Sequence, residues 1–181
     1  MIICAGDNES FEFATSIGIG LINSASNLTQ ICLEQKPKNL LFIGSAGSYT
    51  KDIKVFDIFS SSSGANLENS FLLDSSYTPL ENLIKIEDSF VKDSITINSS
   101  NYITTDFELA QKYQKYKIYL ENMEFFAVLN IAKRFEIPVG GIFIVTNYCN
   151  KEAHQDFIKN HQLSKEKLID YLYQNGYIIK E

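Results

Sequence analysis

The sequence predicts an α/β fold, in which strands and helices alternate along the chain. Three observations support this class. Apolar runs at 39–43 and 139–145 are typical of strands that are covered on both faces of a sheet. Apolar residues recur at helical spacing from 21 to 32 and over 118–135. Both apolar strands lead into small or polar residues, and in open α/β sheets ligands bind at the carboxyl ends of the strands.

The N-terminal half is expected to contain short strands around one helix. The strands share apolar or alternating patterns and are expected at 1–5, 11–19, 39–43 and 53–58. The helix is expected from Leu21 through Cys32 and is closed by Pro37, because the residue before a proline disfavours helical geometry. The small residues "GSAGS" at 44–48 are expected to form a turn, and the serine-rich segment 60–66 a loop.

The C-terminal half is dominated by expected helices. Residues 67–98 are weakly patterned and indicate a mixture of short strands and loops. The polar segment 107–119 indicates an exposed helix or loop, whereas 118–135 is apolar almost all round and predicts a buried helix. A last helix is expected to begin with Ser164 as its N-cap and to end near Gly176.

Length, net charge and the numbers of cysteines and histidines exclude several classes of function. At 181 residues the chain is expected to form one domain, 1–181, and its net charge of −6 argues against a nucleic acid or an anionic membrane as partner. It shows no secretory signal and no apolar run long enough for a membrane span, so a cytoplasmic protein is expected. Three distant cysteines predict free thiols rather than disulfides. His154 and His161 lack metal-ligand spacing, so they are expected at the surface, and no metal site is expected.

Three segments carry side chains with binding chemistry. The "GSAGS" segment leaves backbone N–H groups free to approach a ligand, although it suits a tight turn equally well. Glu121 and Glu124 lie at the start of an otherwise buried helix, where they either meet a partner or occupy a solvated first turn. Asn147 ends an apolar strand and either presents its amide to a ligand or forms a turn.

Taken together and in order, these segments resemble the purine nucleoside phosphorylase / methylthioadenosine nucleosidase superfamily. "SIGIG" is similar to its S-G-I-G segment, "GSAG" to G-[ST]-[AC]-G, "ENMEF" to V-E-M-E-A, and "IPVGGIFIVTN" to its P-x-x-x-x-R-x-[IV]-[ST]-[DN] strand, while "NSSNYIT" is similar to the element that reaches the base. The resemblance implies a three-layer α/β/α fold with a mixed central sheet, in a shortened member of the superfamily. It also implies a homodimer or higher homo-oligomer and cleavage of the N-glycosidic bond of a nucleoside.

The resemblance also assigns roles to individual residues. Glu124 would accept hydrogen bonds from the ribose hydroxyls, and Asn147 would assist the leaving purine. Glu9 lies at the offset of the carboxylate that activates water in the nucleosidases. The other implied substrate-binding residues line the sugar, the nucleophile or the base: Ser45, Ala46, Gly47, Tyr102, Ile103 and Met123.

The expected activity is purine nucleoside phosphorolysis, with inosine or guanosine favoured because members with Asn at this strand end resemble the 6-oxopurine type. No cofactor is expected, and inorganic phosphate would be the co-substrate. The phosphate site would lack the usual guanidinium groups, since Arg134 is the only arginine and lies at a predicted helix end. A hydrolytic nucleosidase that uses Glu9 is therefore the alternative. A catalytically inactive binding or scaffold protein is the second alternative.

Overall fold

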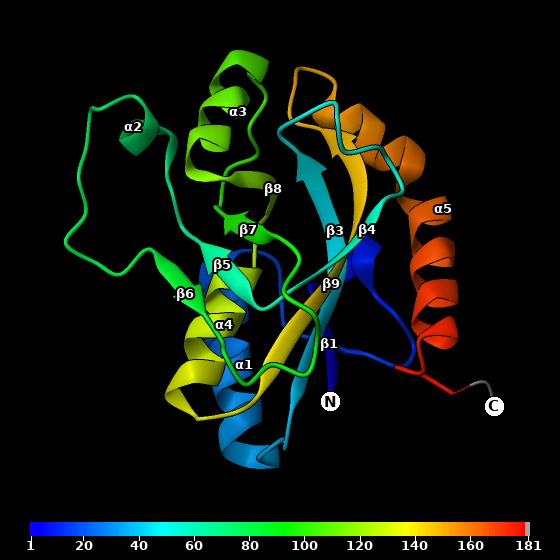
Figure 1. Cartoon of the computed structure of the whole chain (residues 1–181). Coiled ribbons are helices and arrows are strands. Elements are labelled where there is room, and N and C mark those ends of the chain that lie inside the picture. The colour runs from blue at the N-terminus through cyan, green and yellow to red at the C-terminus, as the bar shows by residue number, and fades with distance from the viewer. Residues whose placement is uncertain (180–181) are drawn as a thin grey trace.

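A mixed nine-stranded sheet forms the centre of the molecule in the computed structural model, which describes residues 1–179 (Figure 1). The strands are β1 (Ile2–Cys4), β2 (Thr15–Ser16), β3 (Leu40–Ser48), β4 (Ile58–Ser61), β5 (Ser63–Ala65), β6 (Leu83–Lys85), β7 (Thr96–Ser99), β8 (Ile118–Asn122) and β9 (Val139–Tyr148). Their order is β2-β1-β3-β8-β7-β5-β6, and β9 pairs with β3 and β4. β1, β3 and β9 are parallel, whereas β8 meets β3 antiparallel.

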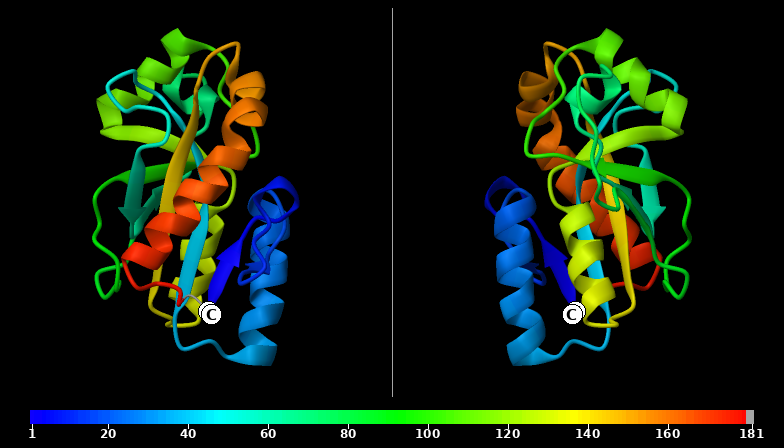
Figure 2. Two further views of the ribbon diagram at one scale, coloured as in Figure 1. Left: turned by 90° about the vertical axis from the view of Figure 1, so that its right-hand side faces the viewer. Right: turned by 90° about the vertical axis from the view of Figure 1, so that its left-hand side faces the viewer.

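Helices cover both faces of this sheet, which confirms the predicted three-layer α/β/α architecture. The helices are α1 (Leu21–Gln35), α2 (Asn69–Leu72), α3 (Phe107–Tyr113), α4 (Phe125–Arg134) and α5 (Ala153–Gln174), with short 3-10 turns η1 (Asp7–Glu9) and η2 (Gln114–Tyr116). Figure 2 shows α5 along one face and α1 with α4 on the other. The helix predicted from Leu21 and the strands predicted at 39–43 and 139–145 are confirmed; the helix ends at Gln35, before Pro37, and both strands extend further.

The two-residue period of β3 explains why its sequence is apolar throughout. Leu40 and Phe42 pack in the core beneath α1 and α4, while Leu41 and Ile43 pack in the core beneath α5. The ring of Phe125 lies edge-on to Phe143, with 4.9 Å between the ring centroids. Both faces of the central strands are therefore buried, as the continuous apolar runs predict.

The prediction of one helix over 118–135 is wrong, because its first five residues form the strand β8 instead. The side chains of Ile118 and Leu120, two residues apart, are both buried, and β8 pairs with β7 and with the end of β3. The chain reverses at Asn122, whose side-chain oxygen accepts a 3.2 Å hydrogen bond from the backbone N–H of Phe125. Strand pairing thus overrides the helical apolar pattern in the first five residues of the range.

Several boundaries in the N-terminal half also differ from the prediction. Only Thr15–Ser16 of the range 11–19 is a strand, since a turn precedes it. The range 44–48 is no turn but the continuation of β3, which β9 pairs along its length. The range 53–58 contains strand only at its last residue, and 60–66 holds the end of β4 and all of β5 instead of a loop.

The last helix begins twelve residues earlier than predicted, at Ala153 with Glu152 as its N-cap. Ser164 is not an N-cap, because it lies buried in the middle of this helix. The actual start, close to the end of β9, has no side-chain cap hydrogen bond. Gly176 follows the helix end with a φ of +73°, a backbone conformation that suits glycine. The helix end near Gly176 is therefore confirmed.

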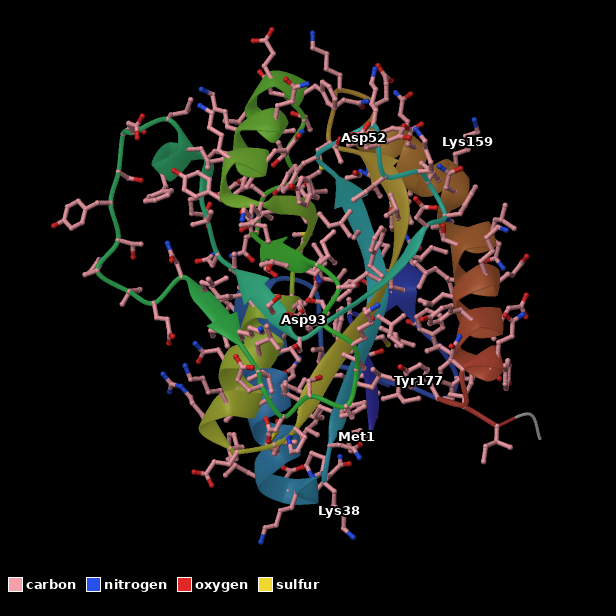
Figure 3. The ribbon with its side chains drawn as sticks, viewed as in Figure 1. Met1, Lys38, Asp52, Asp93, Lys159 and Tyr177 are labelled. Carbon is pink, nitrogen blue, oxygen red and sulfur yellow. The ribbon has the colours of Figure 1, made fainter. Side chains whose placement is uncertain are left out.

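The outside of the molecule carries most of the charge. Figure 3 shows Lys38, Asp52 and Lys159 at the periphery, and the exposed Asp93 lies on the face toward the viewer, where its carboxylate accepts from the N–H of Ser62 at 3.0 Å. None of the helices in the described part of the chain is long and apolar enough to cross a membrane. The three cysteines are free and buried, as predicted.

Candidate active site

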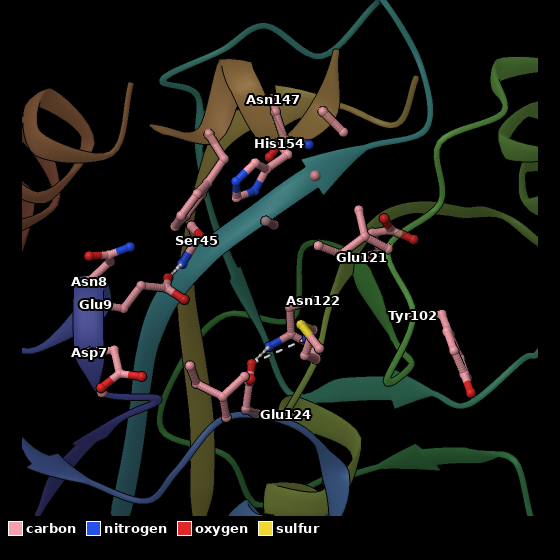
Figure 4. A pocket seen from close by; sticks show the side chains of 18 residues that line it. Asp7, Asn8, Glu9, Ser45, Tyr102, Glu121, Asn122, Glu124, Asn147 and His154 are labelled. Carbon is pink, nitrogen blue, oxygen red and sulfur yellow. Dashed lines mark hydrogen bonds between the residues drawn. The ribbon is translucent and has the colours of Figure 1, made fainter. Parts of the chain in front are cut away.

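A cavity of about 290 Å³ opens where the carboxyl ends of β1, β3 and β9 meet the end of β8 (Figure 4). The strand topology places ligands at this edge in open α/β sheets. The structure brings all of the predicted site residues together on its walls: Glu9, Ser45, Ala46, Gly47, Tyr102, Ile103, Met123, Glu124 and Asn147. These residues come from five separate segments of the sequence, and the fold places them around one cavity.

Glu9 stands directly after β1, on the short turn η1. The chain turns there through Gly6, with a φ of +109°, and Asp7, with a φ of +49°. One carboxylate oxygen of Glu9 accepts a hydrogen bond from the backbone N–H of Ser45, as the dashed line in Figure 4 marks. Removal from water raises the pKa of Glu9, while the bond to Ser45 opposes this rise. Glu9 is thus a carboxyl group fixed at the cavity wall, with a pKa above its ordinary value.

Glu124 is the most deeply buried carboxylate of the cavity, with 3% of its surface exposed. One oxygen accepts from the backbone N–H of Gly20 at 3.0 Å, and the other from the N–H of Met123 at 3.2 Å and the amide of Asn122 at 3.3 Å. Burial, followed by the charge of Glu9, raises its pKa to about 8. The glutamate therefore does not lie on a solvated first turn.

Glu121 is a third buried carboxylate, and no site role was predicted for it. It is 6% exposed and accepts hydrogen bonds from Tyr49 Oη at 2.7 Å, from the backbone N–H of Thr104 at 3.0 Å and from Thr104 Oγ1 at 2.7 Å. Its pKa is raised by burial, and these donors oppose the rise. The signal that would have found it is its position at the end of a strand, which the helical prediction concealed.

The glycine segment forms the floor of the cavity between two strands. A Cβ on Gly47 would lie 3.0 Å from Cys149 Sγ, 3.1 Å from Asn147 Nδ2 and 3.5 Å from Glu121 Cγ. The register of β3 and β9 shifts at this point by one residue, a bulge of the kind that redirects side chains near functional sites. The absence of a side chain at Gly47 leaves space between Asn147 and Glu121, so the segment is a cavity wall rather than a chain reversal.

Asn147 and His154 lie together on the wall above this floor (Figure 4). The side-chain oxygen of Asn147 accepts from Thr146 Oγ1 at 2.8 Å, and its amide nitrogen donates to the carbonyl of Tyr148 at 3.2 Å. One N–H and one lone pair of the Asn147 amide remain for a ligand. His154 is exposed, as predicted, but it also lines the cavity, whereas His161 is half-buried and lies outside it.

The side chains that line the cavity are acidic rather than basic. The carboxylates that line it are Asp7, Glu9, Glu121 and Glu124, and no lysine or arginine is among the described residues on its walls. Arg134 lies elsewhere, beside a hollow that Phe126 and Tyr77 also line. Within residues 1–179, no group of three or more His, Cys, Asp or Glu could hold a metal ion.

Sequence comparison finds no matching family model and no matching curated protein. Solved structures do match. A methylthioadenosine nucleosidase variant from Helicobacter pylori with 5'-methylthioadenosine in its active site superimposes with a TM-score of 0.76 at 18% identity, covering 89% of this chain and 78% of that one. The chain has the nucleoside phosphorylase/nucleosidase fold.

Two further structures with this fold support the same conclusion. The futalosine hydrolase of Helicobacter pylori has a TM-score of 0.76 at 18% identity and covers 88% of this chain and 76% of that one. A methylthioadenosine/S-adenosylhomocysteine nucleosidase from S. pneumoniae, bound to a transition-state inhibitor, has a TM-score of 0.75 at 15% identity, covering 94% and 95%. The fold that the sequence resemblance predicts is therefore confirmed.

Sequence reasoning missed half of the residues that line the cavity. They are Gly6, Asp7, Asn8, Ile19, Glu121, Asn122, Ala153, His154 and Phe157. The residues of the turn after β1 carried a usable signal, because they follow an apolar run at the ligand-binding edge of the sheet. Those of α5 carried none, since the predicted helix began beyond them.

Proposed function

We propose that the protein is a hydrolytic nucleosidase, which cleaves the N-glycosidic bond of a purine nucleoside with water. The observation that carries the proposal is the lining of the cavity, which has four acidic side chains and no described lysine or arginine that could pair with phosphate. At about 4 Å, two like charges near a protein surface repel by roughly 4 kcal/mol. A phosphate dianion would meet such repulsion from each of these acidic groups that is ionised and would find no cationic side chain, whereas a neutral water molecule needs none.

The same carboxylates suit the chemistry of hydrolysis. Cleavage passes through a sugar with oxocarbenium character, whose positive charge buried carboxylates stabilise. Glu124, in its ionised form, accepts hydrogen bonds from the ribose hydroxyls. Glu9, which Ser45 holds in place, removes a proton from the attacking water. The water oxygen bonds to the anomeric carbon, the bond to the base nitrogen breaks, and the departing base takes up a proton.

The phosphorylase hypothesis gains no support from the structure or its relatives. The structures of similar fold described above are named as nucleosidases or a hydrolase. Asn147 stays the residue that contacts the leaving base through its amide, but it donates a hydrogen bond and not a full proton. The preference for inosine or guanosine that this amide suggested finds no counterpart among the similar structures, one of which holds methylthioadenosine.

The proposal is tested by incubating the purified protein with inosine, guanosine, adenosine and methylthioadenosine, each with and without phosphate. We expect free base, measured by chromatography, to appear at the same rate without phosphate. Glu124→Ala should abolish release, whereas Glu12→Gln, which alters an exposed carboxylate away from the cavity, should not. Release that requires phosphate would refute hydrolysis, and no release from any nucleoside would support the inactive scaffold.

A further inference from the structure

One wall of the cavity is a short segment that is fastened at both ends. This segment, Asn101–Thr104, is called the arch here, and it carries Tyr102 and Ile103 at its centre. These two side chains are 75% and 49% exposed, although they line the cavity. Within the described residues the Tyr102 hydroxyl makes no hydrogen bond, whereas the backbone N–H of Tyr102 donates to Ser100 Oγ at 3.1 Å, so the two side chains are positioned through the backbone of the arch and its ends.

The first fastening joins the arch to Glu121. Thr104 is buried, and it donates both its backbone N–H and its hydroxyl to the Glu121 carboxylate, at 3.0 and 2.7 Å. Hydrogen bonds to a charged acceptor are about twice as strong as neutral ones. Two such bonds from one residue to one carboxylate fix both the backbone and the side chain of Thr104.

Tyr49 also holds Glu121 in place. The hydroxyl of the fully buried Tyr49 donates to Glu121 at 2.7 Å and accepts from the amide of Asn98 at 3.3 Å. The Tyr49 ring stacks on Tyr113, with the centroids 4.1 Å apart and the planes 3° from parallel. The Tyr49 hydroxyl donates to the same Glu121 oxygen, Oε2, that accepts from Thr104 Oγ1, so it helps to orient the carboxylate that holds the arch.

The other end of the arch is fastened to the start of α1. The side-chain oxygen of Asn101 accepts a 2.9 Å hydrogen bond from the backbone N–H of Leu21. The neighbouring Gly20 donates its N–H to Glu124, and a Cβ on Gly20 would lie 2.9 Å from that Asn101 oxygen. The arch therefore spans from the turn that holds Glu124 to the carboxylate of Glu121.

We propose that Glu121 is a positioning residue, which fixes the Asn101–Thr104 arch so that Tyr102 and Ile103 cover the bound ligand. A carboxylate that already accepts three hydrogen bonds from the protein has little capacity left for substrate. Its part in substrate recognition is then exerted through the arch. The role in substrate binding rests on the proposed function, whereas the fastening of the arch does not.

Limited digestion with chymotrypsin tests the fastening without any assay of activity. The enzyme cleaves after Tyr102, and the exposed Tyr77, at 88% exposure, supplies an internal reference site far from the arch. We expect Glu121→Gln and Thr104→Val to raise cleavage at Tyr102 relative to Tyr77 by about tenfold, the lower range for losing a hydrogen bond to a charged group. Mass spectrometry of the fragments gives this ratio.

Two matched variants separate positioning from a general loss of stability. Thr104→Ser keeps both donors and should leave the ratio unchanged. Tyr49→Phe removes the hydroxyl that also donates to Glu121. It should change the cleavage ratio by less than about threefold, because the two hydrogen bonds from Thr104 remain. An unchanged ratio in both Glu121→Gln and Thr104→Val would overturn the fastening, as would an equal rise in Tyr49→Phe.

Steady-state kinetics test the consequence for substrate. With the nucleoside that the wild type cleaves, Glu121→Gln and Thr104→Val should raise KM about tenfold and change kcat by less than about threefold, because the arch covers the ligand and does not reach the cleaved bond. Faster digestion with an unchanged KM would overturn the role in binding. Failure of the wild type to cleave any nucleoside would refute the proposed function alone, since the digestion result stands independently.

Discussion

Replacing Glu124 by glutamine is expected to stabilise the protein at pH 8 while it lowers nucleoside cleavage. The folded protein holds the pKa of Glu124 at about 8, above its ordinary value of 4.5, because the carboxyl is buried and faces the charge of Glu9. Between these pH values the folded state binds a proton that the unfolded chain has lost. The free energy of unfolding therefore falls as pH rises from about 4.5 to about 8.

The size of this effect follows from the pKa and from the hydrogen bonds of the site. A change from 4.5 to about 8 corresponds to about 5 kcal/mol, since each pH unit contributes about 1.4 kcal/mol. Glutamine cannot ionise, so it removes this cost. Its NH₂ group must face either the N–H of Gly20 or that of Met123, and one unpaired N–H costs about 1–3 kcal/mol. The net gain at pH 8 is then about 2–4 kcal/mol.

Urea denaturation from pH 5 to pH 8.5 measures this difference. We expect the wild type to lose stability steadily as pH rises and Glu124→Gln to lose less, most clearly between pH 6 and 8. Some slope should remain, because burial also raises the pKa values of Glu9 and Glu121. Glu12→Gln, at an exposed position, should follow the wild type. Equal slopes for wild type and Glu124→Gln between pH 6 and 8 would refute the reasoning.

Three further substitutions test the site and the core. Gly47→Ala should reduce cleavage at least tenfold and destabilise by about 1–3 kcal/mol, because its Cβ would lie 3.1 Å from Asn147 Nδ2; unchanged kinetics would contradict the crowding. Asn147→Asp adds a group that can donate a proton to the leaving base, so kcat should become steeper with pH and fall as pH rises; a pH–rate profile parallel to that of the wild type would count against contact with the base. Phe125→Ala removes the edge-on partner of Phe143 and should lower urea stability by about 3–5 kcal/mol; a loss below about 1 kcal/mol would contradict its place in the core.

The elements that the sequence predicts well are those whose pattern matches their burial. The apolar run of β9 and the helical period of α1 each agree with what covers them, so local pattern and tertiary structure lead to the same result. The start of α5 was missed because Ser164 looks like a cap while Ala153 lacks one in front of it. The helix nevertheless begins there, since its first turns pack beside the end of β9 and the turn η1.

The candidate site shows a different limit. Glu9, Glu124 and Asn147 were found through the resemblance, and no local pattern could show that residues more than 100 positions apart share one cavity. Glu121 was named but left without a role, because its burial depends on strand pairing between β8 and β3. A period of 3.6 read across 118–135 placed it on a helix, where its contacts with Tyr49 and Thr104 would not arise.

The cost of the cavity's carboxylates also bears on whether the protein is an enzyme or an inactive scaffold. The pKa values of Glu9, Glu121 and Glu124 are all raised by burial, so each carboxylate lowers the stability of the fold at neutral pH. A scaffold without catalysis would be more stable with neutral residues at these positions. The positions instead keep carboxylates, each with backbone N–H donors directed at it. Sites that sacrifice stability for a defined charge arrangement are typical of catalysis. Under the proposed function these carboxylates exchange stability for catalysis, and the rise in stability of Glu124→Gln at pH 8 would measure that exchange directly.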